Sequence, residues 1–434
     1  MPSLHPEAPA RRAPVAGVQP LVDDLFRRQY GRMVAGLTRV FGADLLDLVE
    51  DVVQEALLRA LRTWPYEGIP REPEGWLVQV ARNLALDALR RRAMVERKRA
   101  ELEQWAAAAR AVRDDFAPEI ADDTLAMMFL CCEPCLSVEA RVALTLKTLC
   151  GFGVAEIARA LLAKEGTVAQ RLTRAKARLQ RLGAPFSVPP VAQLADRLDS
   201  VLEVLYLLFN EGYAAAQGED LVRAELVREA VRLVGLLIAM PVTALPKVHA
   251  LRALMAFQAA RLPARTGPDG EPATLVEQDR GRWDRAELAA AWFHFDRSMA
   301  GGEVTAYHLE AAIASCHAAA PTYAATDWPR ILRHYDALLR LADSPVVRLN
   351  RAVAVAKVHG PRAGLAELHG LDRKLPAYWL LPATRAQLQW AAGDRAAALV
   401  AFDAALACPC SAPQRQFLVR RRAACAAGDP PPDY

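Results

Sequence analysis

Apolar positions recur at spacings of three and four residues along most of the 434-residue chain. Ala, Leu and Arg dominate these stretches, and runs that alternate β-branched with polar residues are absent. Because this is the period of an amphipathic helix rather than of a strand, we predict an all-α fold. Pro- and Gly-containing loops at 64–73, 183–190 and 263–274 interrupt the pattern.

These interruptions divide the chain into segments of different character. With 53% hydrophobic and 24% charged residues, the chain can form buried cores, which excludes wholesale disorder. Its length favours several domains over one. We expect a disordered leader at 1–20, a helical domain at 21–92, a linker at 93–123, a second helical domain at 124–183, a linker at 184–190 and a helical extension at 191–430.

Basic and acidic residues occupy separate stretches of the first 185 residues, although the net charge of the chain is only +4. The stretch 82–99 has seven basic and two acidic residues, and 164–181 has six basic residues and one acidic residue. The stretch 44–55, in contrast, has five acidic residues and no basic one. This separation predicts two helices that face a polyanion and one helix that faces a basic protein surface.

A helix-turn-helix is predicted over 154–182. Ile157 and Ala158 give the first helix an apolar face, Val168 and Leu172 do so for the second, and the pattern breaks at 162–166. The side chains of the second helix that point away from its apolar stripe are Thr167, Gln170, Arg171 and Arg174. Side chains placed in this way contact base edges and phosphates in the major groove, so we predict binding to duplex DNA.

The helix expected around 45–60 carries an acidic stripe. Asp47, Asp51 and Glu55 recur at every fourth position, opposite the apolar face that contains Leu48 and Val52. Like charges stacked in this way lower the stability of a helix unless a cationic surface neutralises them. We therefore predict that this stripe binds a basic partner.

The helix expected at 76–92 combines a packed face with a polar face. Leu77 and Ala81 belong to the packed face. The polar side carries Gln79, Arg82, Asn83, Arg90 and Arg91. Unstacking a base costs a few kcal/mol, which hydrogen-bonding side chains and an aromatic platform can offset. The pattern favours contact with opened DNA, with the arginines on phosphates.

These three motifs, in this order, resemble the extracytoplasmic-function (group IV) sigma factors. Residues 51–60 resemble region 2.2 of that family, 76–92 resemble regions 2.3 and 2.4, and 156–179 resemble the DNA-binding region 4. The resemblance covers about 21–183.

The resemblance implies a role for each matching residue. The coiled coil in the largest subunit of core RNA polymerase would be bound by Asp47, Asp51, Gln54 and Glu55. The −10 promoter element would be contacted by Trp64, Gln79, Arg82, Asn83, Arg90, Arg91 and Arg92. Asn83 would meet a flipped base, and Trp64 would supply an aromatic platform or, with equal weight, pack in the core. The −35 element would be read by Thr167, Gln170, Arg171, Arg174 and Arg178.

The turn of the helix-turn-helix departs from the family pattern. Leu162 and Lys164 stand where the family usually has a Gly and a small polar residue. Leu cannot cheaply adopt a left-handed conformation, and Lys cannot cap a helix as Ser does. We therefore expect Glu165 or Thr167 to cap the second helix.

Residues 191–430 extend beyond a minimal sigma factor and resemble the subfamily with a tetratricopeptide-like extension. The positions that fit its repeats are Trp328, Ile331, Leu332, Tyr335, Gly393, Ala398, Phe402 and Ala405. Stacked helix pairs would form a solenoid with a concave binding surface, and irregular helical packing is the alternative. In the charge-dense segment 277–284, Asp279 and Arg280 could latch the extension onto the sigma domains. Otherwise the segment is a solvated loop that Trp283 anchors.

Neither metal nor catalytic chemistry is predicted. Cys131, Cys132 and Cys135 lack a second pair of ligands nearby, and His308 and His317 lie in an apolar helix, as packed histidines do. No phosphate-binding glycine loop or pair of catalytic carboxylates is visible, so we expect no cofactor and no enzymatic activity. Without an apolar run of roughly 20 residues or a signal-peptide core, we expect a cytoplasmic protein that does not bind membranes.

We interpret the chain as a promoter-specificity subunit whose partners are core RNA polymerase and promoter DNA. Its extension would regulate it through another protein or an intramolecular contact. One alternative is a stand-alone helix-turn-helix regulator with a repeat domain for ligands or proteins, which leaves the acidic stripe unexplained. The other is a tetratricopeptide scaffold, which leaves both basic helices unexplained.

Overall fold

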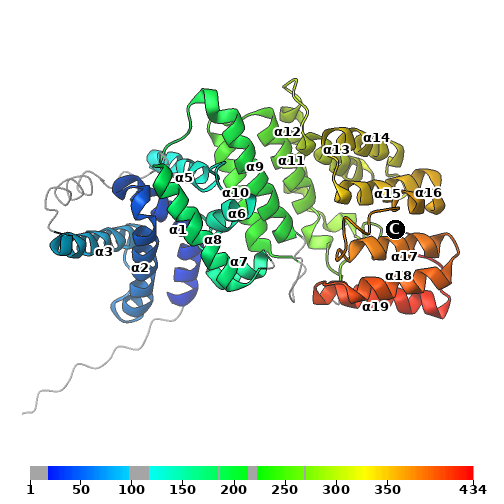
Figure 1. The fold of residues 1–434 in the computed structure, drawn as a ribbon, viewed down its shortest axis with the longest axis horizontal. Coiled ribbons are helices and arrows are strands. Elements are labelled where there is room, and N and C mark those ends of the chain that lie inside the picture. Colours follow the sequence, from blue (N-terminus) through cyan, green and yellow to red (C-terminus); the bar gives the residue numbers. More distant parts are fainter. Residues whose placement is uncertain are drawn as a thin grey trace, which may run out of the picture. The chain divides into compact units, whose positions relative to one another are not determined.

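The computed structural model describes residues 18–96, 117–161, 163–183, 186–213, 222–267 and 270–433. Within these residues the chain is helical, and its only β-type pairing is an isolated bridge between Thr266 and Pro272. The predicted all-α fold is confirmed (Figure 1). The chain divides into two compact units, residues 1–204 and 205–434, with the boundary inside α9.

Unit 1 holds the helices that carry the predicted polymerase and DNA contacts. They are α1 (Val18–Phe41), the short 3-10 helix η1 (Ala43–Leu45), α2 (Leu46–Glu67), α3 (Pro73–Glu96), α5 (Ala117–Cys131), α6 (Val138–Thr148), α7 (Val154–Ala160), α8 (Glu165–Leu182) and the start of α9 (Val191–Tyr213). Val18 already belongs to α1, and the rest of the expected leader at 1–17 lies outside the described residues. The expected linker at 93–123 is described only at its two ends.

The first loop is shorter than the sequence predicts. We expected it to begin at Trp64, but α2 continues through Pro65 to Glu67. Because Pro65 stands in the last turns of the helix, the backbone hydrogen bond that it cannot donate is lost near an end rather than in the middle. Gly68 then ends α2 with a positive φ of 93°, a conformation that glycine adopts without strain.

In unit 1, α1 connects the helices before residue 97 with the helices after residue 116. Helices α1, α2 and α3 pack against one another, and α1 also packs against α5 and α6. Gly31 of α1 lies so close to α6 that a β-carbon there would stand 2.2 Å from the carbonyl oxygen of Leu149. Arg39 of α1 donates a 2.9 Å hydrogen bond to the buried carboxylate of Asp123 in α5.

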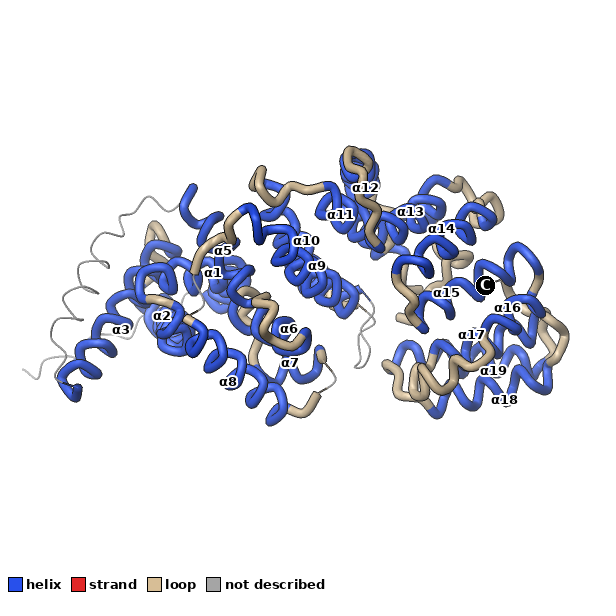
Figure 2. Tube along the Cα trace, turned by 45° about the horizontal axis from the view of Figure 1, so that its top comes forward, coloured by secondary structure: helices blue, strands red, loops and turns tan. Residues whose placement is uncertain are grey.

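Unit 2 contains the end of α9 and the helices of the extension. They are α10 (Ala224–Ala239), α11 (Pro246–Ala259), the 3-10 helices η2 (Leu262–Ala264) and η3 (Arg280–Arg282), α12 (Arg285–Ser298), α13 (Ala306–Ala319), α14 (Trp328–Leu341), α15 (Pro345–His359), α16 (Pro361–Glu367), α17 (Leu380–Ala391), α18 (Arg395–Ala407) and α19 (Ala412–Ala427). From α10 onward each helix packs against the next one in the chain (Figure 2).

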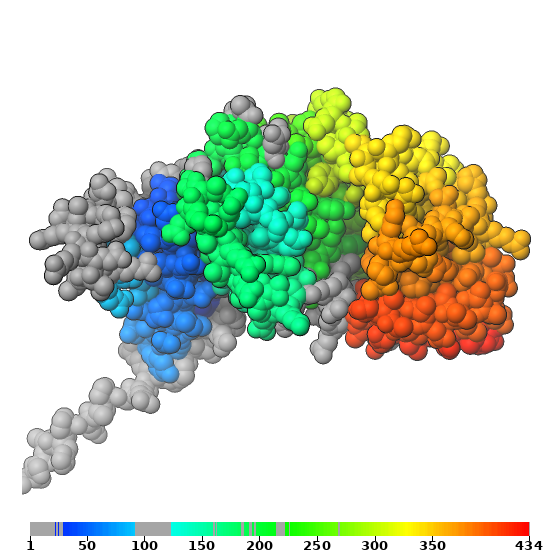
Figure 3. Space-filling model, viewed as in Figure 1, coloured from blue at the N-terminus to red at the C-terminus, as the bar shows by residue number. Residues whose placement is uncertain are grey.

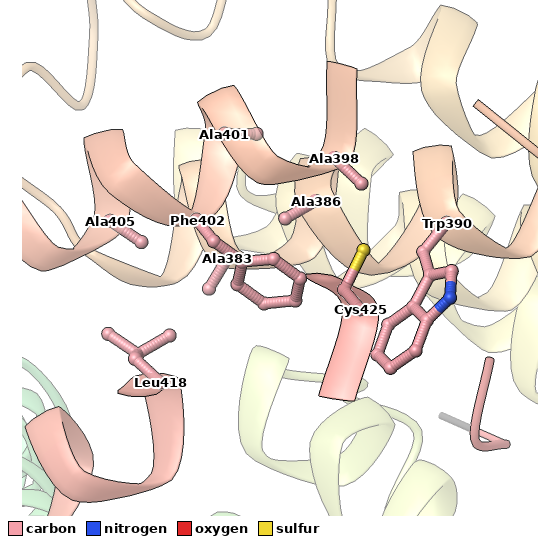
Figure 4. Close-up of a cluster of buried hydrophobic side chains, with 9 residues drawn as sticks. All are labelled: Ala383, Ala386, Trp390, Ala398, Ala401, Phe402, Ala405, Leu418 and Cys425. Carbon is pink, nitrogen blue, oxygen red and sulfur yellow. The ribbon is translucent and has the colours of Figure 1, made fainter. Parts of the chain in front are cut away.

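Helices α17, α18 and α19 share one apolar core, shown in Figure 4. Trp390 of α17 lies edge-on to Phe402 of α18, with 6.2 Å between ring centroids. Ala398 and Ala405 are fully buried beside them, and Gly393 makes the turn between α17 and α18 with a φ of 87°. In the space-filling view, the orange and red residues of α17 to α19 form a continuous surface (Figure 3).

Candidate polymerase and nucleic-acid interface

Helix α8 separates a buried stripe from an exposed polar face. Its buried side chains are Val168, Leu172, Ala175 and Leu179. Of the predicted DNA-reading residues, Thr167, Gln170, Arg174 and Arg178 are exposed and Arg171 is partly exposed. The helix therefore presents polar and cationic groups on the side opposite its core contacts, as an element that enters the major groove requires.

The start of α8 corrects the predicted capping. Lys164 stands at the N-cap in an extended conformation, and no side chain caps the helix, so neither Glu165 nor Thr167 has the expected role. Glu165 lies in the first turn, where its carboxylate interacts favourably with the helix dipole. Leu162 of the turn lies outside the described residues.

Helix α2 presents the predicted acidic stripe to solvent. Asp47 and Asp51 are exposed, and Gln54 and Glu55 are partly exposed. Glu55 makes a 3.5 Å ion pair with the exposed Arg59 of the same helix. Exposed pairs of this kind contribute little to stability, so most of the negative charge of the stripe stays accessible to a partner.

An ion pair between Lys176 and Glu50, which the sequence pattern did not predict, joins α8 to α2. Lys176 of α8 is only 15% exposed, and its Nζ atom lies 2.8 Å from Oε2 of Glu50 and 2.5 Å from Oδ1 of Asp47. Glu50 is 4% exposed, and its other oxygen accepts a 2.9 Å hydrogen bond from the hydroxyl of Thr148 in α6. Figure 2 shows α8 beside α2.

The buried carboxylate of Glu50 sets the charge state of its neighbourhood. Burial alone would lower the pKa of Lys176, but the charges and hydrogen bonds of Glu50 and Asp47 outweigh it, so that this pKa is raised. Burial, followed by the charge of Glu50, raises the pKa of the Tyr30 hydroxyl in α1. The Lys176 ammonium group thus stays charged at neutral pH beside the buried carboxylate of Glu50.

Helix α3 carries most of the predicted −10 residues on its surface. Gln79 and Asn83 are exposed, and Nε2 of Gln79 donates a 3.1 Å hydrogen bond to Oδ1 of Asn83. Arg90 and Arg91 are exposed, and Arg90 makes a 3.2 Å ion pair with the equally exposed Asp87. Arg82 is partly exposed, while the side chain of Arg92 lies outside the described part of the chain.

Of the two roles expected for Trp64, the structure favours packing in the core over an aromatic platform for a base. The residue is 1% exposed and packs edge-on against Trp76, with 5.4 Å between ring centroids. The exposed aromatic side chain at this end of α2 is Tyr66, at 56% exposure. In the sequence, the feature that indicated exposure of Tyr66 was its position near the start of the predicted loop at 64–73.

A pocket of about 500 Å³ lies between α1 and the start of α3. Its wall includes the apolar side chains of Met33, Leu37 and Val78, and its polar side includes Gln79 and Arg82. This volume lies in the range of ordinary ligand sites, and its polar edge belongs to the predicted −10 surface.

The segment 277–284 makes its described contacts inside the extension. Nη1 of Arg280 donates hydrogen bonds to the carbonyl oxygens of His317 (2.6 Å) and Ala320 (2.8 Å) at the end of α13. Its guanidinium carbon lies 4.6 Å from the centroid of the Trp283 ring, and that ring is 4% exposed. Asp279 is exposed, and its carboxylate accepts a hydrogen bond from the backbone of Gly281. These contacts favour the loop anchored by Trp283.

Most cysteines and histidines of these motifs are packed, whereas Cys135 is exposed. Cys131 and Cys132 are buried, and burial raises the pKa of the Cys132 thiol to about 12. His308 accepts a hydrogen bond from the backbone of Thr305 at the start of α13, and burial, followed by nearby arginine charges, lowers the pKa of His317 to about 3. No set of three residues suited to hold a metal ion occurs in the described ranges. Among the described helices, none has the length and hydropathy needed to cross a bilayer.

Comparisons with known proteins match the order of these elements. The family models for sigma-70 region 2 and sigma-70 region 4 match residues 26–94 and 127–179, and a family of unknown function matches residues 197–299. An uncharacterized protein of Rhizobium meliloti (strain 1021) is 39% identical over 387 residues, which is 86% of this chain and 89% of the relative. The ECF RNA polymerase sigma factor SigM of Mycobacterium tuberculosis is 34% identical over 171 residues, which is 39% of this chain and 81% of SigM. No solved structure matches.

The chain therefore belongs to the extracytoplasmic-function family of sigma-70 RNA polymerase sigma factors and carries a C-terminal extension. Helices α1 to α3 form sigma region 2, and α5 to α8 form sigma region 4. Proteins of this family are regulators of transcription that bind DNA. The two sigma regions imply binding to core RNA polymerase and to promoter DNA.

Proposed function

We propose that the protein directs core polymerase to promoters through three surfaces. The acidic stripe of α2 (Asp47, Asp51, Gln54 and Glu55) binds a basic surface of core polymerase. The polar face of α3 binds the opened −10 element, and α8 reads the −35 element in duplex form. The observation that carries this proposal is the exposure of these polar side chains opposite the buried stripes of the same helices.

At the −10 element, the Gln79–Asn83 pair supports recognition of a base. In the free protein these two side chains satisfy each other through one hydrogen bond, so a base edge can replace that bond without leaving a buried polar group unpaired. Tyr66 supplies the aromatic surface, and the pocket beside Gln79 and Arg82 offers room for an unstacked base. Arg90 and Arg91 hold phosphates.

We propose that the extension regulates promoter-directed transcription through exposed residues on its surface. The anchoring contacts of Arg280 and Trp283 hold the segment 277–284 in place, and Asp279 and Arg282 remain exposed beside them. These two exposed charges are available to a regulatory protein or to another part of the chain.

Reconstitution with purified core polymerase tests the proposal. Run-off transcription from matched promoters is expected only when the protein and core polymerase are both present. If the protein binds the same duplex equally well alone and core polymerase adds no initiation, it acts as a stand-alone regulator. If it binds no DNA under either condition, it acts as a scaffold.

The Asn83→Ala variant tests the mechanism at the −10 element. We expect it to weaken open-complex formation more than core binding. An equal loss of both would contradict a role in base recognition.

A further inference from the structure

The segment that follows α19 folds back over two other helices of unit 2. Gly428 ends α19 with a φ of 92°. Pro430, Pro431 and Pro432 come next, and they favour an extended backbone because each proline fixes its own φ near −65°. We call residues 429–433 the proline segment. Figures 1 and 2 show the C-terminal end beside α15 and α17.

Two contacts of different chemistry hold the end of the proline segment. The side-chain amide of Gln387 in α17 donates a 2.9 Å hydrogen bond to the carbonyl oxygen of Pro432. The next residue, Asp433, pairs through its carboxylate with Nζ of Lys357 in α15. A backbone carbonyl and a carboxylate in consecutive residues are thus each bound by a group from a different helix.

Two aromatic rings position the ammonium group of Lys357. Its Nζ atom lies 5.2 Å from the ring centroid of Tyr323 and 5.8 Å from that of Trp328. These two rings meet edge-on, with 5.9 Å between their centroids, and the side chain of Lys357 is only 11% exposed. A cation near aromatic faces is attracted by the ring electrons. Because both rings lie outside the proline segment, they can hold the ammonium group in place for the carboxylate of another molecule.

The proline segment is bound in a way that permits competition. The side chain of Asp433 is 54% exposed, and Asp429, Pro430 and Pro431 are exposed as well. An ion pair with this exposure contributes little free energy of binding. A short tether, in contrast, gives the segment an effective concentration in the millimolar range, which keeps it at the site. A segment of similar chemistry from another molecule can therefore displace it by binding more tightly.

We infer that Tyr323, Trp328, Lys357 and Gln387 form a binding site for an extended, proline-containing acidic segment of a partner protein, and that the proline segment occupies this site as an internal ligand. The feature that the site recognises is a proline followed by an acid. Proline has no N–H group that needs a partner, its carbonyl oxygen binds Gln387, and the carboxylate that follows binds Lys357. The inference goes beyond the proposed function, because this binding requires neither DNA nor core polymerase.

A fluorescently labelled peptide tests the inference. The peptide Gly-Asp-Pro-Pro-Pro-Asp-Tyr, with an amidated end, reproduces residues 428–434, and fluorescence anisotropy measures its Kd. We expect the 434-residue chain to bind it about tenfold more weakly than a chain that stops after Pro430, because the tethered segment competes only in the longer chain. The shortened chain keeps Gly428 at the end of α19, and circular dichroism checks that its helical content is unchanged.

Single substitutions locate the site. In the shortened chain, Lys357→Met should weaken binding of the peptide about tenfold, and a peptide with Asn in place of its second Asp should lose as much. Lys374→Met is the matched control, since Lys374 is an exposed lysine in the loop between α16 and α17, and it should leave the Kd unchanged. In the 434-residue chain, Asp433→Asn should strengthen binding of the peptide, because it releases the internal ligand.

Four outcomes would overturn the inference. Absence of peptide binding to the shortened chain would show that the site takes no free segment. Equal binding by the two chains would show that the proline segment does not occupy the site. Equal binding of the Asp and Asn peptides would show that the carboxylate is not recognised. Dimers of the 434-residue chain that disappear on shortening would assign the proline segment to a second copy of the chain.

Discussion

Nζ of Lys176 lies 2.8 Å from Oε2 of Glu50, although 126 residues separate the two in the chain. This pair brings α8 of region 4 against α2 of region 2. Each helix thus has an exposed polar face for an outside partner and one charged residue committed to the other region.

The close approach of α1 and α6 predicts an unusual response to a Gly→Ala change. Alanine normally stabilises a helix by about 1 kcal/mol relative to glycine. A β-carbon at position 31 would lie 2.2 Å from the carbonyl oxygen of Leu149, so Gly31→Ala should instead lower the free energy of unfolding, by about 1–3 kcal/mol. Gly166→Ala in α8, where nothing lies within 4 Å of the added carbon, is the control. Denaturant unfolding measures both, and a stabilised Gly31→Ala variant would refute the contact.

Substitution of Trp64 should lower stability, whereas substitution of Tyr66 should reduce promoter opening. Trp64 is buried, so Trp64→Ala should lower the free energy of unfolding by about 3–5 kcal/mol. Tyr66 is exposed, so Tyr66→Ala should leave unfolding nearly unchanged and reduce strand opening, measured as permanganate reactivity of −10 thymines. Normal opening by the Tyr66 variant would argue against stacking by this ring.

Charge reversal on the acidic stripe should abolish the association with core polymerase. Asp51→Lys combined with Glu55→Lys replaces two carboxylates that face solvent, so the helical content measured by circular dichroism should stay the same. Glu67→Lys changes an exposed acid at the other end of α2 and serves as the control. A pull-down that still recovers core polymerase with the double variant would refute the role of the stripe.

The cations of α8 should act on affinity and on salt dependence, whereas Gln170 should act on sequence preference. Arg174→Ala and Arg178→Ala should each reduce the slope of log K against log salt by about 0.9, because each removes a phosphate contact. Gln170→Ala should cost about 1–3 kcal/mol on the preferred −35 sequence without a change in slope. Titrations with duplex DNA at several salt concentrations distinguish these effects. Identical behaviour of all three variants would contradict the assignment.

Arg280 should stabilise the extension. Its guanidinium bonds two carbonyl oxygens at the end of α13, so Arg280→Ala should lower the free energy of unfolding of the extension by about 2 kcal/mol. Arg282→Ala, at an exposed position two residues away, should have almost no effect. Promoter-dependent transcription by both variants then shows whether the segment has a role beyond stability.

The spacing of apolar residues was sufficient to predict the helices but not the contacts between them. The 3.6-residue pattern predicted which side of α8 would be exposed, because Val168, Leu172 and Ala175 define its buried stripe. Lys176 stands at the edge of that stripe, and Glu50 lies among Leu46, Val49 and Val53 of α2. An acid on an apolar face signals a buried partner, but the sequence does not identify that partner, since the pairing depends on tertiary packing.

The sequence left one role undecided and gave one wrong cap where two physical effects compete. Trp64 suits both a core and a base-stacking surface, and only the packing against Trp76 decides between them. The start of α8 forms without a capping side chain, because Lys164 supplies the required backbone conformation. The predicted boundaries of the domains stay predictions, and residues 97–116 and 184–185 lie outside the described residues.

The exposed arginines of α8 have a consequence for the order of events in the cell. The contact of Lys176 with α2 leaves Arg174 and Arg178 of α8 exposed, so these two cations stay accessible to a polyanion. If α8 binds duplex DNA as we propose, a molecule that has not yet met the transcribing enzyme would be able to slide along the chromosome and wait near a target. Search and recruitment then become independent steps, and either one can come first.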